Sequence, residues 1–221
     1  IEITDDVAPV ITIGDTTTSL AVGGDFEVAD ASANDCVDGE VELSVTSDVD
    51  TKIDLIEVSD DWKDLNLEAN NNYVIWIGHS TFLIKKNGYT ILTDPIFSER
   101  ASPFKNIGPK RLIPPAIPIG SLPNIDFVTV SHNHYDHLDT ASLKEIYINN
   151  PNAIFLVPAG DKKLLQRKGI KNIFEYEWWN GYKTKNLELT FTPVQHWSKR
   201  GLFDRNKSLW GGWFFKFEDY S

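Results

Sequence analysis

The run Ser131-His132-Asn133-His134-Tyr135-Asp136-His137-Leu138-Asp139 contains most of the candidate metal-binding side chains of this 221-residue chain. It holds three of the five histidines within six residues. Residues two apart in an extended segment point the same way, so His132 and His134 can offer imidazole nitrogens to one metal ion. Asp136 and His137 then face a neighbouring position that suits a second divalent ion. Two adjacent ions are typical of hydrolytic chemistry.

The residues on either side of this run predict its place in the fold. Residues 126–131 are a short β-branched run typical of a buried strand, and residues 140–147 indicate a helix with Asp139 or Thr140 as its N-cap. We therefore expect the ligands on a strand-to-helix loop, where open α/β sheets bind ligands. The alternative is a polar turn whose histidines only form hydrogen bonds, but His and Asp clustered at ligand spacing favour a metal site.

Four further stretches make a family resemblance specific. They are Ile77-Gly78-His79-Ser80, Thr93-Asp94-Pro95-Ile96, Gly108-Pro109-Lys110-Arg111, and Gln195-His196-Trp197-Ser198 with the residues that follow it as far as Leu209-Trp210-Gly211. Together with the histidine run, they resemble the metallo-β-lactamase superfamily and, within it, the N-acylphosphatidylethanolamine-hydrolysing phospholipase D branch. The resemblance covers roughly residues 72 to 215. It implies an αββα fold, in which two sheets lie between helical layers.

The resemblance also implies roles for single residues. His132, His134 and His196 would bind one zinc ion, while Asp136 and His137 would belong to a second site and act as catalytic residues. His196 lies 59 residues after His137, so only its Gln-His-Trp-Ser context assigns it to the site. Four other side chains are expected to support the ligands through hydrogen bonds or to bind substrate: His79, Asp94, Trp197 and Arg200.

The chain departs from the family pattern at its C-terminal end. Family members continue to a Gly-Asp-Thr-Gly segment, whose aspartate bridges both metals, and to a further metal-binding histidine. Neither is found before Ser221, so the match is C-terminally truncated. The second site would keep only Asp136 and His137, whereas a catalytic zinc typically has three protein ligands. We expect two zinc ions in a full-length parent, but at most one well-held ion and little turnover in this chain.

The expected function is that of a zinc-dependent phosphodiesterase of the phospholipase D type, acting on N-acylphosphatidylethanolamine-like phospholipids. Alternatives are another hydrolase of the same fold, such as a lactonase or a nuclease-like enzyme, and a non-catalytic surface-exposed binding module. Basic loop residues near the site, including Arg100, Lys110, Arg111 and Arg200, can meet a phosphate or serve as ordinary surface charges. Trp197 is expected to line a lipid-facing pocket.

Charge divides the chain into two parts. Residues 1–70 carry 19 acidic residues and two lysines, whereas residues 71–221 have a formal charge of +6, which together give the net −11. Such asymmetry favours two units with different partners. We predict an acidic, incomplete immunoglobulin-like segment at 1–57, a linker at 58–71, and the N-terminal portion of a hydrolase domain at 72–221. Residues 5–51 resemble part of a bacterial surface immunoglobulin-like repeat.

The fold class is therefore predicted as α/β (α+β): a partial αββα sandwich preceded by an all-β segment. In the hydrolase part we expect strands near 73–77, 81–85, 89–92, 126–131, 153–157, 172–176, 187–193 and 208–217, with helices near 140–149 and 160–168. Asn87-Gly88 is a strong hairpin signal. The seven prolines of residues 95–125 predict a long irregular loop.

Partners and location follow from the same features. A phospholipid at a membrane surface is the expected substrate, since basic charge and loop aromatics suit an anionic interface. No nucleic-acid partner and no transmembrane segment are expected, and the oligomeric state stays open. The hydrolase resemblance implies a peripheral membrane or cytoplasmic enzyme, whereas the immunoglobulin-like stretch implies an extracytoplasmic one. A single cysteine does not decide between them.

Overall fold

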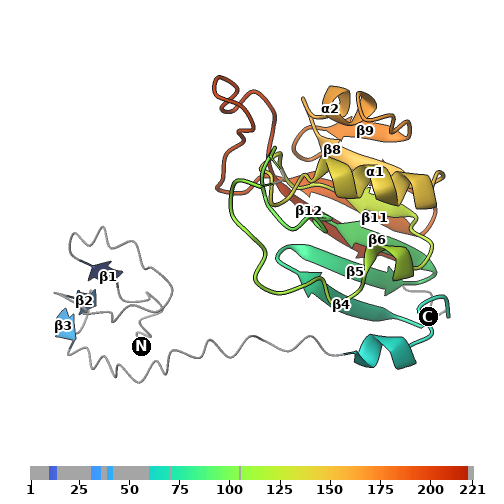
Figure 1. The fold of residues 1–221 in the computed structure, drawn as a ribbon, viewed down its shortest axis with the longest axis horizontal. Coiled ribbons are helices and arrows are strands. Elements are labelled where there is room, and N and C mark those ends of the chain that lie inside the picture. The colour runs from blue at the N-terminus through green and yellow to red at the C-terminus, as the bar shows by residue number, and fades with distance from the viewer. Residues whose placement is uncertain are drawn as a thin grey trace, which may run out of the picture. The chain divides into compact units, whose positions relative to one another are not determined.

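The computed structural model describes residues 10–13, 31–35, 39–41, 60–69, 71–104 and 106–218 (Figure 1). Contacts divide the chain into two units, Ile1–Asp54 and Leu55–Ser221. The described part of the first unit is an antiparallel sheet of β1 (Val10–Ile13), β2 (Ala31–Asp35) and β3 (Gly39–Val41), in that order. Most of the predicted immunoglobulin-like segment lies outside the described residues, so that assignment stays a prediction, as do the predicted domain boundaries.

The second unit is built on a six-stranded sheet with strands in the order β4-β5-β6-β7-β8-β9. Its first half is an antiparallel meander and its second half is parallel. The turn between β5 and β6 has positive φ at Asn87 (51°) and Gly88 (82°), as the predicted Asn-Gly hairpin requires. The strands are β4 (Tyr73–Gly78), β5 (Thr81–Lys86), β6 (Tyr89–Thr93), β7 (Phe127–Thr129), β8 (Ile154–Pro158) and β9 (Ile173–Tyr176).

A second, antiparallel sheet has the order β10-β11-β12. It consists of β10 (Gly181–Lys183), β11 (Leu187–Thr192) and β12 (Gly212–Phe217). The sequence did not predict β10, which is only three residues long and begins with a glycine. The last strand begins at Gly212 rather than at residue 208, because the segment before it belongs to a long loop after β11 (Figure 1).

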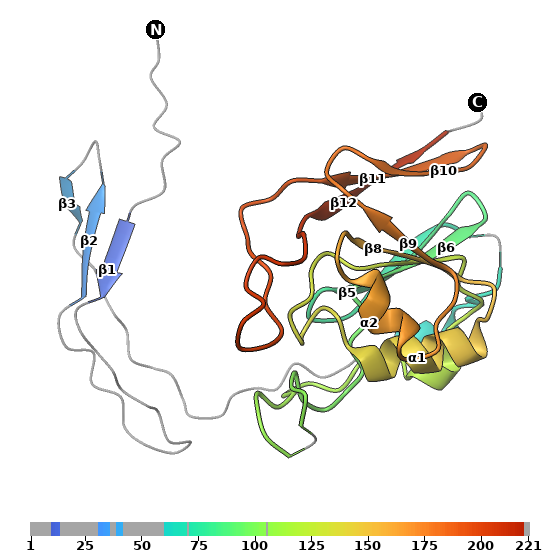
Figure 2. The ribbon, with the colours of Figure 1, turned by 90° about the horizontal axis from the view of Figure 1, so that it is seen from above.

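Figure 2 shows three layers in the second unit. Two helices, α1 (Thr140–Asn149) and α2 (Lys162–Gln166), cover one face of the six-stranded sheet, and the three-stranded sheet covers the other. One core lies on the helical side and includes Val128, Leu143 and Phe155. A second core joins Ile91 and Leu156 to residues of β11 and β12. Helix, sheet and sheet are three of the four layers of the predicted αββα sandwich.

Short helical turns and a long loop complete the described part of the second unit. The 3₁₀ helices η1 (Asp61–Asp64) and η2 (Ile119–Ser121) flank the meander and interrupt the proline-rich loop, respectively. That loop otherwise runs irregularly from β6 to β7, as its prolines predicted. Among the described residues, no helix is long and apolar enough to pass through a membrane.

The two sheets meet beside the histidine-rich run. The indole Nε1 of Trp213 on β12 donates a hydrogen bond to the carbonyl oxygen of Val130 (2.9 Å), and the backbone N–H of Gly211 donates to Ser131 (2.9 Å). The start of β12 is thus fixed to the end of β7. The loop that carries the ligands and the loop that carries His196 therefore leave the two sheets at neighbouring points.

Candidate metal centre

The loop between β7 and α1 carries four of the predicted ligands. The backbone N–H groups of His137 and Leu138 both donate to the carbonyl oxygen of His134 (3.1 and 2.8 Å), so the loop turns back on itself after His134. The Asp139 side chain then accepts a hydrogen bond from the N–H of Ala141 (3.0 Å) and caps α1. A tight turn between a strand end and a helix start explains how closely spaced side chains point to two adjacent positions.

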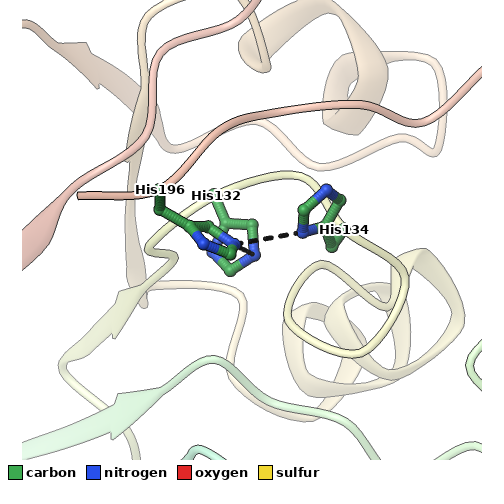
Figure 3. Close-up of side chains that lie close together, drawn as sticks. All are labelled: His132, His134 and His196. Carbon is green, nitrogen blue, oxygen red and sulfur yellow. Dashed lines mark hydrogen bonds between the residues drawn. The ribbon is translucent and has the colours of Figure 1, made fainter. Parts of the chain in front are cut away.

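Three imidazoles converge in the His132 cluster, defined by His132, His134 and His196 (Figure 3). The Nε2 atom of His196 lies 3.0 Å from Nε2 of His132 and 3.3 Å from Nδ1 of His134. A tetrahedral zinc ion with Zn–N bonds of ~2.0–2.1 Å separates its ligand nitrogens by about 3.3 Å. The spacing of the three rings therefore fits one divalent ion, as the sequence predicted for these residues.

The electrostatics of the His132 cluster favour neutral rings at His132 and His134. Burial, reinforced by the neighbouring imidazoles, lowers the pKa of His132 to about 2, and burial also lowers the pKa of His134. The hydroxyl of Ser131 donates to Asp94 (2.7 Å) and lies 2.9 Å from Nδ1 of His132, which assigns the ring proton of His132 to Nδ1. The Nε2 lone pair of His132 is then free to face the cluster, as a metal ligand requires.

A second group, the His79 cluster, consists of His79, Asp136 and His137. The Oδ2 atom of Asp136 lies 3.0 Å from Nε2 of His79 and 3.6 Å from Nε2 of His137, and the two Nε2 atoms are 3.4 Å apart. The two clusters adjoin each other, because the ring centroids of His132 and His137 are 4.1 Å apart. The structure thus brings together all five predicted ligands and adds His79, which was expected to support the ligands or bind substrate.

Asp94 supports both clusters from the end of β6. Its buried carboxylate accepts hydrogen bonds from the N–H of Ser131 (2.6 Å), the Ser131 hydroxyl (2.7 Å) and Nδ1 of His137 (2.9 Å). Burial by itself would lower the pKa of His137, but the hydrogen bond and charge of Asp94, together with Asp136, raise it. A carboxylate that orients a histidine in this way commonly stands behind a metal-ligating ring. Asp94 thus contacts the loop of both clusters, and its predicted role in supporting metal ligands stays a prediction.

Arg200 lies behind the ligand loop rather than in a substrate cavity. Its Nη1 atom donates to the carbonyl oxygens of Asn133 (3.0 Å) and Leu138 (2.7 Å), at the two ends of the turn. The guanidinium carbon is 4.1 Å from the centroid of the Tyr135 ring, whose hydroxyl donates to the Arg200 carbonyl (3.1 Å). Arg200 thus joins the loop of His196 to the loop of His132 and His134. Of the two predicted roles, these contacts favour support of the ligands.

Trp197 lies at the edge of a cavity of about 1070 Å³ that reaches both clusters. Its ring packs edge-on against His134, with centroids 4.5 Å apart, and 37% of the residue is exposed. The cavity wall is mostly apolar and includes Trp76, Ile77, Leu112, Ile113 and Pro114 in addition to His79, His134 and Asp136. The structure places Trp197 in the cavity wall beside His134, and its predicted role in binding substrate stays a prediction.

One buried acid beneath the ligand loop was not predicted. Asp161, just before α2, is 2% exposed, and its Oδ1 atom accepts a hydrogen bond from Nδ2 of Asn133 (3.2 Å). Burial raises the pKa of Asp161 to about 6. The two residues are 28 positions apart and Asp161 follows an ordinary turn, so no local pattern indicated the contact.

Comparisons with known proteins agree with this geometry. A family model for the beta-lactamase superfamily domain matches residues 89–220. The chain is 38% identical over 150 residues to N-acyl-phosphatidylethanolamine-hydrolyzing phospholipase D 1 of Caenorhabditis elegans, covering 64% of this chain and 42% of that protein. It is 39% identical over 142 residues to the mitochondrial N-acyl-phosphatidylethanolamine-hydrolyzing phospholipase D of Saccharomyces cerevisiae, covering 62% and 30%. These relatives confirm the resemblance inferred from the motifs.

The similarity is partial in extent. The chain spans less than half the length of these two curated relatives. Among solved structures, a metallo hydrolase from the archaeon Ignicoccus hospitalis matches with a TM-score of 0.45 at 22% identity, covering 66% of this chain and 55% of that chain. The metal-binding and catalytic roles of single residues stay predictions that the following experiments test.

Replacing Arg200 by alanine should loosen the ligand loop. Arg200→Ala is expected to weaken binding of Zn²⁺ at the His132 cluster by roughly 10–100-fold, as is typical when a residue that orients metal ligands is lost. A competition titration against a chromophoric chelator measures the affinity, and circular dichroism verifies the fold. Lys207→Ala removes an exposed charge from the same loop and serves as the matched control. Unchanged affinity in Arg200→Ala would show that the loop keeps its shape without the guanidinium.

The buried carboxyl of Asp161 predicts a pH-dependent difference in stability. Because burial raises its pKa from 3.8 to about 6, the folded state binds the proton more tightly, so stability is lost as the pH rises through this range. Asp161→Asn cannot ionise. Its free energy of unfolding relative to the wild type should therefore increase by about 2 kcal/mol between pH ~4 and pH ~7.5. Urea unfolding in metal-free buffer measures this, and a difference that stays constant with pH would contradict the assignment.

Proposed function

This chain belongs to the β-lactamase superfamily. We propose that it carries the zinc centre of a phospholipase D-type phosphodiesterase. The proposed substrates are N-acylphosphatidylethanolamine-like phospholipids. One observation carries the proposal: a mostly apolar cavity opens directly onto both donor clusters. Two relatives with 38% and 39% identity bear this activity in their names, which supports the same substrate class.

The shape of the cavity supports a lipid substrate. A volume of about 1070 Å³ is at the upper end of the range for pockets that enclose small ligands. Trp76 and Leu112 supply apolar surface on its wall, while His79, His134 and Asp136 line it at the clusters. An acyl chain packed along the apolar wall would bring a phosphodiester to the donor atoms. A small polar substrate would bury little apolar surface against this wall and would gain little binding free energy from it.

Arg111 supports an anionic substrate in the same cavity. Its guanidinium is half-buried, and burial lowers its pKa, although it stays a cation at neutral pH. Nη2 donates to the carbonyl oxygen of Ile96 (2.6 Å), which fixes the guanidinium in the cavity wall. A partly buried cation in the wall of an apolar cavity is suited to a phosphodiester oxygen.

The residues of the chain would have different roles at the metal centre. His132, His134 and His196 would hold one zinc ion, and Asp136 and His137 would contribute to a second. When bound, such ions lower the pKa of water toward ~7 and stabilise charge that develops on phosphoryl oxygens. Asp94 holds the proton of His137 on Nδ1 and so presents Nε2 to its cluster.

Other residues keep this arrangement in place. Arg200 fixes both ends of the ligand loop through its bonds to Asn133 and Leu138. Trp197 packs edge-on against His134 and would limit access of bulk water to that ring. Arg111 would orient the phosphate. Each of these residues binds, orients or excludes water, which are the contributions that a protein makes around a hydrolytic metal centre.

A membrane surface is the proposed partner, and the tip of the loop after β11 supports it. Leu202 and Phe203 are 84% and 86% exposed at this tip, near Lys199, Arg205 and Lys207. The carboxylate of Asp204 accepts the N–H groups of Arg200 and Gly201 and so holds the turn closed. Exposed apolar residues flanked in sequence by lysine and arginine suit the interface of an anionic bilayer.

Hydrolysis is tested with a full-length protein that contains this chain. We expect metal-dependent release of N-acylethanolamine from N-acylphosphatidylethanolamine. His132→Ala or His134→Ala should reduce the rate by more than the roughly 10–100-fold typical of residues that only support ligands. Ile148→Ala, an exposed site on α1, is the control. Turnover of lactones or of phosphodiesters in nucleic acid without N-acylethanolamine release would reassign the enzyme, and a folded protein that binds no zinc would favour a non-catalytic module.

Membrane docking is tested on the tip. Leu202→Ser with Phe203→Ser should lower binding to vesicles of phosphatidylcholine and phosphatidylglycerol by more than tenfold, since burial of each side chain contributes about 1.5–3 kcal/mol. Binding to pure phosphatidylcholine should be weaker throughout, and added salt should weaken binding to the anionic vesicles. Ile148→Ser exchanges an exposed apolar residue elsewhere and is the matched control. Equal vesicle binding by the tip variant and this control would contradict docking through the tip.

A further inference from the structure

We propose that His79 is a ligand of the second metal ion, so that the His79 cluster supplies three protein donors instead of two. This inference rests on the proposed metal centre and adds to it a residue from the turn between β4 and β5. It concerns metal binding by the chain itself. Its outcome is therefore independent of which substrate the enzyme hydrolyses.

The first argument is the triangle that the three donor atoms form. Its sides are 3.0 Å (His79 Nε2 to Asp136 Oδ2), 3.4 Å (His79 Nε2 to His137 Nε2) and 3.6 Å (His137 Nε2 to Asp136 Oδ2). Bonds of ~2.0–2.2 Å to nitrogen and oxygen in a tetrahedral site place the donor atoms about 3.3–3.6 Å apart. The two sides that end at His137 lie in this range, and the side between His79 and Asp136 is shorter. Two histidines and a carboxylate are also a common donor set for catalytic zinc.

The second argument is the backbone that carries His79. The pairing of β4 with β5 shifts register between Trp76 and Gly78, and φ is positive at both Gly78 (138°) and His79 (50°). Positive φ at a residue other than glycine costs on the order of 1–3 kcal/mol and is found most often at functional sites. Bulges next to active sites commonly redirect a side chain. Here the irregular turn directs the imidazole of His79 toward Asp136 and His137.

The turn is held in that shape by its neighbours. The indole Nε1 of Trp76 donates to the carbonyl oxygen of His79 (2.8 Å). A side chain at Gly78 would place its Cβ 3.2 Å from Nη1 of Arg111, in addition to requiring an unfavourable φ. The turn closes the hairpin of β4 and β5, and Trp76 and Gly78 help to fix the orientation of His79 within it.

The third argument is the protonation pattern around His137. Its Nδ1 proton is directed to Asp94 (2.9 Å), so the Nε2 lone pair faces His79 and Asp136. With an ion between them, both imidazoles and the carboxylate direct lone pairs toward the metal. No N–H group then points at another N–H group. The five histidines of the chain are divided between the two clusters, with none elsewhere. Such a distribution favours a ligand over an incidental surface residue.

A competing explanation is that His79 only donates a hydrogen bond to Asp136 or touches the substrate, since it is half-exposed in the cavity wall. The two explanations differ in what they predict for metal binding. A ligand set of two donors agrees with the expectation from sequence of at most one well-held ion. A set of three predicts that the chain holds two ions.

The experiment uses ¹⁵N-histidine-labelled chain loaded with ¹¹³Cd²⁺ alone. A ligating imidazole nitrogen shows direct coupling to cadmium, whereas a ring that is only hydrogen-bonded shows none. We expect coupling from all five histidines to two distinct cadmium ions, with Nε2 of His79 sharing its ion with His137. Coupling restricted to the other four rings, or one bound cadmium coupled only to His132, His134 and His196, would overturn the proposal.

Variants give an independent measurement by zinc stoichiometry after dialysis. His79→Ala should reduce the bound zinc from two ions to one, with affinity for the second ion lowered by more than 100-fold, beyond the range for residues that merely support ligands. His79→Asp offers a replacement ligand and should retain two. Lys144→Ala, exposed on α1, is the control. Two tightly held ions in a folded His79→Ala would overturn the proposal, and if that variant does not fold, the cadmium couplings of the wild type decide.

Discussion

The carboxylate of Asp94 is the interaction on which the site depends. It accepts hydrogen bonds from the backbone and hydroxyl of Ser131 and from Nδ1 of His137, and so connects the end of β6 to both donor clusters. Because Ser131 in turn accepts the ring proton of His132, one buried charge sets the orientation of two imidazoles. Removing that charge would leave several buried donors unpaired, which costs more than the loss of a single exposed hydrogen bond.

The layered fold fixes the relative positions of the loops that carry the donor atoms, which Asp94 alone cannot do. The six-stranded sheet carries the ligand loop and the turn of His79, whereas the loop of His196 leaves the smaller sheet. Trp213 and Arg200 join the two parts through bonds to backbone carbonyls, which do not depend on the identity of the residue they contact. Apolar packing between the sheets fixes the layers at the distance that these bonds require. The donor geometry is therefore a property of the whole second unit.

The sequence allowed most of the second unit to be predicted, because its signals are local. β-branched runs indicated the strands, Asn87-Gly88 the hairpin, and the histidine run the loop after β7. Features that depend on distant contacts were harder to predict. The place of His79 depends on a bulge and a positive φ, and that of Arg200 on carbonyl groups more than 60 residues away. β10 has only three residues, which are too few to show an alternating pattern. α2 is shorter than predicted, and Gly169 soon after its end has a positive φ that a helix does not allow.

The separation of the donors along the chain bears on how the protein folds. His79 and His137 are 58 residues apart, and His132 and His196 are 64 residues apart, whereas His132 and His134 are nearly adjacent. Contacts between distant residues form late because long loops must close first. The His79 cluster requires the first hairpin and the loop after β7, whereas the His132 cluster requires that loop and the loop after β11. Both donor sets are therefore completed only by long-range contacts, and a partly folded chain offers metal ions only two local pairs, His132 with His134 and Asp136 with His137.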